Sequence, residues 1–125
     1  MQTTEIQQTE WPAFFDNFSR QHDGSLINLE VFGSEMGDQV EGRALALEGM
    51  TAEWDEGSGY RLAIMMGAKP DDHITHNISK PVQVHLEQTD EGVDTALAIK
   101  AADGTTTLLR FHAAVVGEAA DAVAA

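Results

Sequence analysis

The chain has 125 residues, with 21 acidic and 7 basic side chains, a formal net charge of −14 and no cysteine. This length predicts a single domain, and the lack of cysteine excludes disulfides, thiolate zinc sites, iron–sulfur clusters and thiol nucleophiles. The strong negative charge disfavours nucleic acids and anionic membranes as partners, because both are themselves polyanions.

The first eight residues are polar and predict a flexible N-terminus. They contain no basic or apolar leader segment, and apolar runs such as LAIMMGA are much shorter than a bilayer span. We therefore expect a soluble, cytoplasmic protein with no membrane partner.

Residues 9–24, TEWPAFFDNFSRQHDG, predict a helix, with Pro12 tolerated in its first turn and Gly24 able to end it. Four aromatic side chains fall at i, i+3, i+4 and i+7 and so share one face: Trp11, Phe14, Phe15 and Phe18. Packing of this face on a sheet is the favoured interpretation. The alternative is a partner-binding surface, as in helices that dock into grooves.

From Ser25 onward the apolar period falls to two, which is typical of strands with one buried and one solvated face. Alternating segments occur at residues 25–32, 39–47, 50–54, 60–66, 73–79 and 82–88, and in a hairpin over 94–112 with an Asp-Gly turn. The predicted fold class is α+β. An N-terminal helix packs on a strongly bent antiparallel sheet, or on a small partly open β-barrel, of about six to seven strands, with an Sm- or SH3-like topology.

This domain is expected to cover residues 9–112, after the flexible residues 1–8. The low-complexity sequence AAVVGEAADAVAA forms a C-terminal tail over 113–125.

The segment PDDHITH raises the question of a metal site formed by Asp71, Asp72, His73 and His76. Its flanking prolines and β-branched residues favour a turn followed by a strand. On a strand, residues an odd number apart point to opposite faces, so the two histidines would diverge. The structural interpretation is therefore favoured, and the metal site stays open as an alternative.

Common catalytic motifs, such as a nucleophile elbow, a phosphate-binding glycine loop or an H-E-x-x-H helix, are absent from the sequence, and no cofactor is predicted. The leading hypothesis is a non-enzymatic binding or assembly module that forms a homodimer or binds another protein. One alternative is a metal-binding protein or metal-dependent enzyme using the Asp71–His76 segment. Another is a stress-associated or salt-adapted protein, because an acidic surface suits a salt-rich cytoplasm.

Four blocks of the sequence carry a family resemblance: EWPAFFDNFSRQHDG, PDDHITH, LEQTDEG and ADGTTTLLRF. Together they resemble a bacterial protein family of unknown function, domain of unknown function 5335, over roughly residues 5–112. The resemblance implies a bacterial, single-domain protein. It implies no activity, cofactor or catalytic residue.

Overall fold

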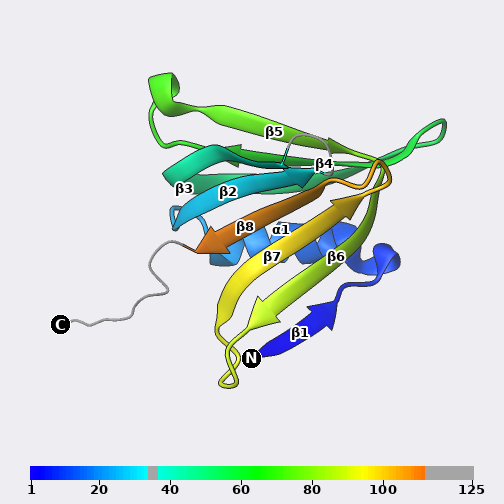
Figure 1. Ribbon diagram of the computed structural model, residues 1–125, viewed down its shortest axis with the longest axis horizontal. Helices are drawn as coiled ribbons and strands as arrows, with labels where there is room; N and C mark the ends of the chain where they lie inside the picture. The colour runs from blue at the N-terminus through cyan, green and yellow to red at the C-terminus, as the bar shows by residue number, and fades with distance from the viewer. Residues whose placement is uncertain (34–36, 112–125) are drawn as a thin grey trace.

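The computed structural model describes residues 1–33 and 37–111, which form one α-helix and one eight-stranded antiparallel sheet (Figure 1). The helix is α1 (Trp11–Gln21), and the 3-10 turns are η1 (Gln8–Glu10) and η2 (Pro70–Asp72). The strands are β1 (Gln2–Glu5), β2 (Leu26–Gly33), β3 (Gly37–Asp55), β4 (Gly59–Met66), β5 (Ile74–Ser79), β6 (Pro81–Gln88), β7 (Asp94–Ala101) and β8 (Thr106–Phe111). Their order in the sheet is β1-β6-β7-β8-β2-β3-β4-β5. None of the helices in this described part is long and apolar enough to cross a membrane.

The predicted α+β class, with one helix packed on a bent antiparallel sheet, is confirmed. The predicted number of six to seven strands is wrong, since the described residues form eight, and the alternative of a partly open barrel is not confirmed, because these strands form one sheet that ends in β1 and β5. Two segments predicted as separate strands, 39–47 and 50–54, are parts of the single strand β3. A register shift between Leu47 and Gly49 interrupts the alternation there, because a bulge inserts one extra residue while the strand continues.

β3 is the strand that bends the sheet. Its first part pairs with β2 and its second part pairs with β4, so the chain passes from one half of the sheet to the other within one strand. Ala44, with φ 55°, lies in the bulged region, and its N–H donates to Oδ1 of Asn28 at 2.7 Å. That hydrogen bond satisfies a backbone group that the bulge removes from the regular ladder.

The helix buries its aromatic face against the sheet. Trp11, Phe15 and Phe18 are 1%, 0% and 2% exposed, whereas Phe14 is only partly buried. The Ser19 hydroxyl accepts a hydrogen bond from the Met50 N–H at 2.8 Å and so fixes α1 to β3. These contacts agree with the packing interpretation of the aromatic face.

The helix begins later than the sequence predicted. Thr9, the first residue of the predicted helix, lies inside η1, and α1 starts at Trp11 without a side-chain cap. The indole Nε1–H of Trp11 donates to the Ile6 carbonyl at 3.0 Å, which ties the start of the helix to the preceding segment. Tertiary packing of a large aromatic residue therefore compensates for the missing cap.

The N-terminal segment expected to be flexible contains strand β1, which pairs with β6 from Gln2↔Gln88 to Glu5↔His85. The Ile6 N–H continues this pairing by donating to the Val84 carbonyl at 2.8 Å. The predicted tail over 113–125, and the last residue of the predicted domain, His112, lie outside the described residues.

Candidate functional site

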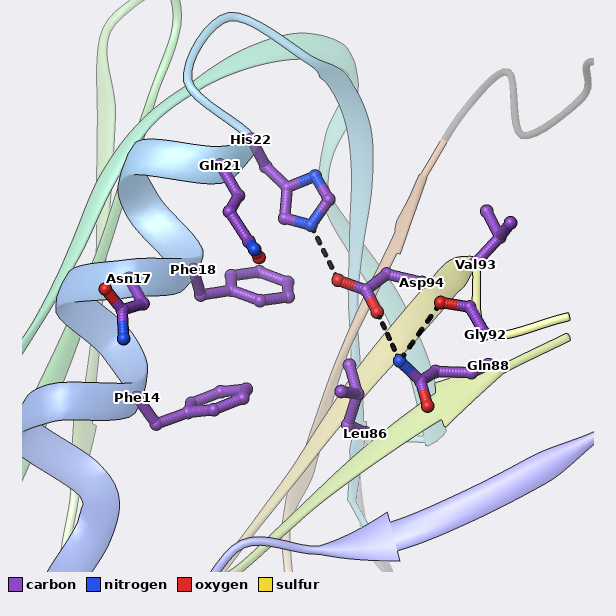
Figure 2. Close-up of a pocket in the computed structure, with 10 residues that line it drawn as sticks. All are labelled: Phe14, Asn17, Phe18, Gln21, His22, Leu86, Gln88, Gly92, Val93 and Asp94. Atoms are coloured by element: carbon purple, nitrogen blue, oxygen red, sulfur yellow. Dashed lines mark hydrogen bonds and ion pairs between the residues drawn. The ribbon is translucent and has the colours of Figure 1, made fainter.

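A groove of about 540 Å³ runs between α1 and the β6–β7 hairpin (Figure 2). Its lining consists of Phe14, Asn17, Phe18, Gln21, His22, Leu86, Gln88, Gly92, Val93 and Asp94. The apolar part is contributed by the edge of the aromatic helix face, by Leu86 on β6 and by Val93 after the hairpin turn. The rings of Phe14 and Phe18 stack at a centroid distance of 5.5 Å with an interplanar angle of 27°, and both lie on the helix side of the groove.

The β6–β7 turn holds the opposite rim in place. The Thr89 N–H donates to the Val93 carbonyl at 2.9 Å, and the Val93 N–H donates to the Thr89 hydroxyl at 3.1 Å. Gly92, with φ 89°, supplies the left-handed conformation that this turn requires. As a result the Val93 side chain is held at the rim while remaining 56% exposed.

A polar array closes one end of the groove. His22 Nε2 lies 2.7 Å from Asp94 Oδ2, and the Gln88 amide donates to Asp94 Oδ1 at 2.8 Å and to the Gly92 carbonyl at 3.3 Å. The side chains of His22 and Asp94 are 20% and 14% exposed, so this pair is largely shielded from water. Both carboxylate oxygens therefore have a partner inside the protein.

The imidazole of His22 is also fixed by aromatic contacts. Its ring centroid lies 4.6 Å from that of Phe18 and 4.4 Å from that of Phe111 on β8. His22 follows the last residue of α1, and its N–H donates to the Phe18 carbonyl at 3.1 Å. Contacts with Phe18 on α1, with Phe111 at the end of β8 and with the Asp94 carboxylate thus hold the His22 ring in one orientation.

A histidine oriented by a carboxylate is an arrangement that can remove or supply a proton. Among the described residues, the groove lining contains no hydroxyl, thiol or amine side chain. The described part of the lining also contains no Lys or Arg. The chemistry available is hydrogen bonding by amides and an imidazole beside an apolar, aromatic surface.

The residues considered for a metal site are not brought together. Asp71 and Asp72 lie in η2, and His73, just before β5, has Nδ1 3.5 Å from Glu48 Oε1 and Nε2 3.1 Å from Thr75 Oγ1. His76 points to the other face of β5, as period-two geometry requires. Within residues 1–33 and 37–111, no group of three His, Asp or Glu side chains could hold a metal ion.

His76 instead reaches into the space between the two halves of the sheet. Its Nε2 lies 3.3 Å from the hydroxyl of Thr107, a residue only 3% exposed on β8. Burial lowers the pKa of His76 below its ordinary value of 6.5, because the charged imidazolium loses water, while Glu41 acts in the opposite direction.

The four aromatic residues considered as a partner surface divide into two sets. Trp11 and Phe15 belong to the core and offer no accessible surface, whereas Phe14 and Phe18 also line the groove. His22, Gln88 and Asp94 were not predicted from the sequence as site residues. No local motif marks them, because His22 and Asp94 are 72 positions apart in the sequence.

Comparison with known proteins assigns the chain to a family. The family model described as "Family of unknown function (DUF5335)" matches residues 2–119. An uncharacterized protein of the bacterium Aquifex aeolicus (strain VF5) is 27% identical over 115 residues, covering 92% of this chain and 96% of the relative. No solved structure matches the chain. Since the family model spans nearly all of the sequence, the predicted resemblance is confirmed, and the chain belongs to this family of unknown function.

Proposed function

We propose that the protein is a non-enzymatic binding module, and that its groove between α1 and the β6–β7 hairpin takes a small, uncharged molecule with an apolar ring. The observation that supports this most is the fixed His22–Asp94–Gln88 array beside the exposed edge of the aromatic helix face. A concave, largely apolar site with a few oriented polar groups is the usual form of a small-molecule site.

The charges of the groove favour an uncharged ligand over an ion. An anion would find no Lys or Arg in the lining and would approach a chain of net charge −14. A cation would find the carboxylate of Asp94 already hydrogen-bonded through both oxygens. The side-chain amide of Gln21, by contrast, lies in the groove and can donate to or accept from an uncharged polar group (Figure 2).

The apolar part of the groove favours a ring. The partly buried Phe14, stacked on the buried Phe18, contributes the aromatic surface on one side, with Leu86 and Val93 opposite. Aromatic groups pair with such surfaces in offset or edge-on geometry, which adds about 0.5–1.5 kcal/mol beyond the burial of area.

Three probes of nearly equal size and different charge test this proposal: benzyl alcohol, benzylammonium and benzoate. Each is titrated into isotopically labelled protein while the NMR signals of Leu86, Val93 and His22 are followed. We expect benzyl alcohol to bind most tightly and to shift these signals. Benzoate binding as well as the alcohol, or no shift with any of the three probes, would contradict the proposal.

Two valines provide a matched pair of variants for the same titration. Val93 at the groove rim and Val82 on the far part of β6 are 56% and 50% exposed, and only Val93 lines the groove. Val93→Asp is expected to weaken benzyl alcohol binding by about tenfold, or about 1.4 kcal/mol, because it places a hydrated charge on the apolar rim. Val82→Asp should leave binding unchanged.

We further propose that this module acts as a homodimer in the cytoplasm, since closed symmetric dimers are the commonest assemblies. The Sm- or SH3-like topology predicted from the sequence would bring no function by itself. Sedimentation at increasing protein concentration tests the dimer directly, and a single monomeric species at every concentration would refute it.

A further inference from the structure

β5 forms a free edge of the sheet, at the opposite end from β1 (Figure 1). It pairs with β4 in an unbroken register from Arg61↔Ser79 to Met66↔Ile74, and no strand within the described residues pairs with its other side. Its six residues, ITHNIS, include no Asp, Glu, Lys or Arg, although 22% of the chain is charged. Exposed edges are normally protected by charge, proline, bulges or shortness, and β5 uses none of these devices along its length.

A cleft of about 270 Å³ runs along this edge. The inward-facing His76 and Ile78 line it, and so do the outward-facing Asn77 and Ser79. Successive side chains of a strand point to opposite faces, so a cleft that touches both sets must pass around an edge of the strand. The β4 side is occupied by pairing, and no β4 residue lines the cleft, so the cleft lies at the free edge.

The far wall of the cleft is formed by Val31 on β2, Ala101 on β7 and Thr107 on β8, and Asp103 and Thr105 of the β7–β8 turn also line it. Val31 and Ala101 are apolar, and Thr107 is the hydroxyl partner of His76. The cleft therefore lies between β5 and residues of β2, β7 and β8, and a strand added to β5 would cover it with its inward-facing side chains.

We propose that the β5 edge pairs with β5 of a second copy of this chain, in antiparallel orientation about a two-fold axis. This assignment rests on the proposed homodimer and names its interface. Antiparallel pairing lets each free edge satisfy the backbone N–H and C=O groups of the other, so one uncharged strand is sufficient for a self-complementary contact.

Charge supports a second copy rather than a different occupant. Two chains of net charge −14 repel each other, and screening at physiological salt acts over about 8 Å. Contact between identical chains is least costly where no like charges meet, and β5 presents such a strand. A basic peptide would find no carboxylate on the strand itself, and the carboxylate of Asp103, which lines the cleft, already accepts two hydrogen bonds from Thr105.

The pattern of side chains is also compatible with this symmetry. A two-fold axis perpendicular to the sheet keeps inward-facing residues inward, so the axis lies between the two strands at a residue, such as His76 or Asn77, that faces its own copy. The isoleucines of the partner copy, Ile74 and Ile78, would then lie on the cleft side of the extended sheet. Since six residues span only about 20 Å, we expect a reversible, concentration-dependent dimer.

Sedimentation of wild type and two matched lysine variants tests the assignment. Asn77→Lys places a charge on the exposed face of β5, and Thr3→Lys does the same on β1. We expect wild type and Thr3→Lys to dimerise and Asn77→Lys to stay monomeric at the same concentrations. A wild-type monomer at every concentration overturns both the homodimer and this interface. A dimer that persists in Asn77→Lys, or is lost in Thr3→Lys, overturns the interface alone.

Disulfide cross-linking is an independent measurement if a lysine variant fails to fold. The chain has no cysteine, so any cross-link must come from an introduced residue. Opposed residues of an antiparallel pair have Cα atoms about 4.5–5.5 Å apart, within disulfide range. We expect a covalent dimer from Asn77→Cys alone, or from a mixture of Thr75→Cys and Asn77→Cys. A covalent dimer from Thr3→Cys alone, with none from the β5 variants, overturns the assignment.

Discussion

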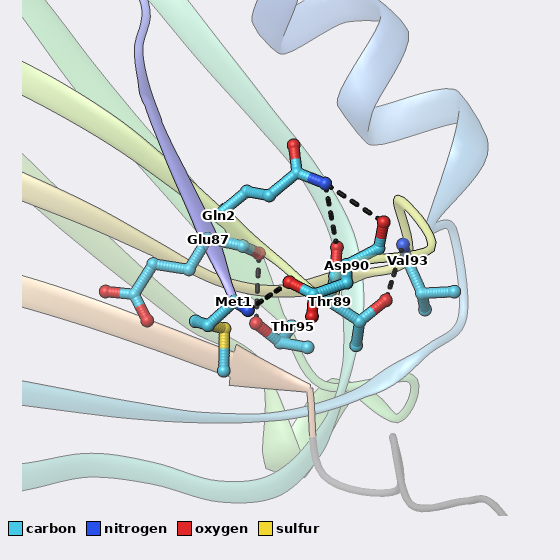
Figure 3. A network of polar contacts seen from close by, with 7 residues as sticks. All are labelled: Met1, Gln2, Glu87, Thr89, Asp90, Val93 and Thr95. Atoms are coloured by element: carbon cyan, nitrogen blue, oxygen red, sulfur yellow. Dashed lines mark hydrogen bonds and ion pairs between the residues drawn. The ribbon is translucent and has the colours of Figure 1, made fainter.

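The two edges of the sheet, β1 and β5, differ in how they are protected. β1 has four residues, all exposed, and its first residues are held by the β6–β7 turn. Figure 3 shows the amino group of Met1 against the carboxylate of Asp90, and the Gln2 amide donating to the carbonyls of Asp90, at 3.1 Å, and Thr89, at 3.4 Å. β5 has six uncharged residues beside an open cleft.

This difference indicates that the two edges have different roles. β1 is short and ends in Glu5, so it acts as a cover for the longer strand β6. β5 contributes Ile78 to the core on one face and leaves its backbone edge free on the side of the cleft. Substitutions near β5 should therefore affect stability more than equivalent substitutions near β1.

The largest difference in stability is expected between the alanine variants of two glycines, one in the loop before β5 and one in the turn that holds β1. Gly67 and Gly92 have φ angles of 100° and 89°, so alanine is strained at both positions. A Cβ at Gly67 would in addition overlap the carbonyl group of Asp72, whereas the space around Gly92 is open. Gly67→Ala should lower the free energy of unfolding by about 2–4 kcal/mol, and Gly92→Ala by about 1 kcal/mol.

Urea denaturation of the two alanine variants measures this contrast. Equal losses in both would show that backbone strain alone decides the outcome, and that the close approach of Asp72 to Gly67 does not constrain the loop before β5.

A smaller effect is expected from the hydroxyl of Thr107, which is buried under β5. Thr107→Val keeps the shape of the side chain and leaves His76 Nε2 without this partner. We expect a loss of about 1 kcal/mol in the free energy of unfolding, because a partly buried polar group loses its hydrogen bond. Thr106→Val, on the same strand but only partly buried, is the control and should change stability by less than about 0.5 kcal/mol.

Protonation of His76 on β5 makes the free energy of unfolding depend on pH. Because burial lowers its pKa in the folded protein, the unfolded chain takes up the proton first as pH falls below 6.5. The stability linked to His76 is therefore fully present above pH 6.5, is lost as pH falls through the lower folded pKa, and then levels off. His76→Gln should remove the part of the pH dependence of stability that comes from His76, while the part that comes from the Asp and Glu carboxylates remains.

The free energy of unfolding of wild type and of His76→Gln is measured by denaturation at a series of pH values on both sides of 6.5. The difference between the two plots of this free energy against pH is the contribution of His76. Parallel curves through the whole range would show that the imidazole is not destabilised by its position in the cleft.

Much of the fold could be predicted from the sequence because local periodicity recorded which face of each element is buried. The i, i+3, i+4, i+7 spacing of the aromatic residues placed α1 on the sheet, and the alternation in HITHNIS placed His73 and His76 on opposite faces. These features depend on neighbours within one element, so a single segment contains the whole signal.

The features that were missed depend on contacts between distant segments. QTTE has no apolar alternation and becomes a strand because it pairs with β6. His22 and Asp94 meet because the end of α1 and the start of β7 are packed together, and neither segment marks the other. β3 was predicted as two strands, divided near Gly49, because a bulge interrupts the alternation of apolar and polar residues in the same way as a turn does.

The smallest effect is expected at the β1 edge itself. Gln2→Ala removes two hydrogen bonds from the side-chain amide to the β6–β7 turn, but both are exposed to water, which replaces them. The free energy of unfolding should therefore fall by about 0.5 kcal/mol or less. Amide hydrogen exchange should instead report faster opening of β1 while the amides of β5 keep their rates. If β5 exchanged faster as well, the two edges would open as one cooperative unit, and the separate roles assigned to them would be wrong.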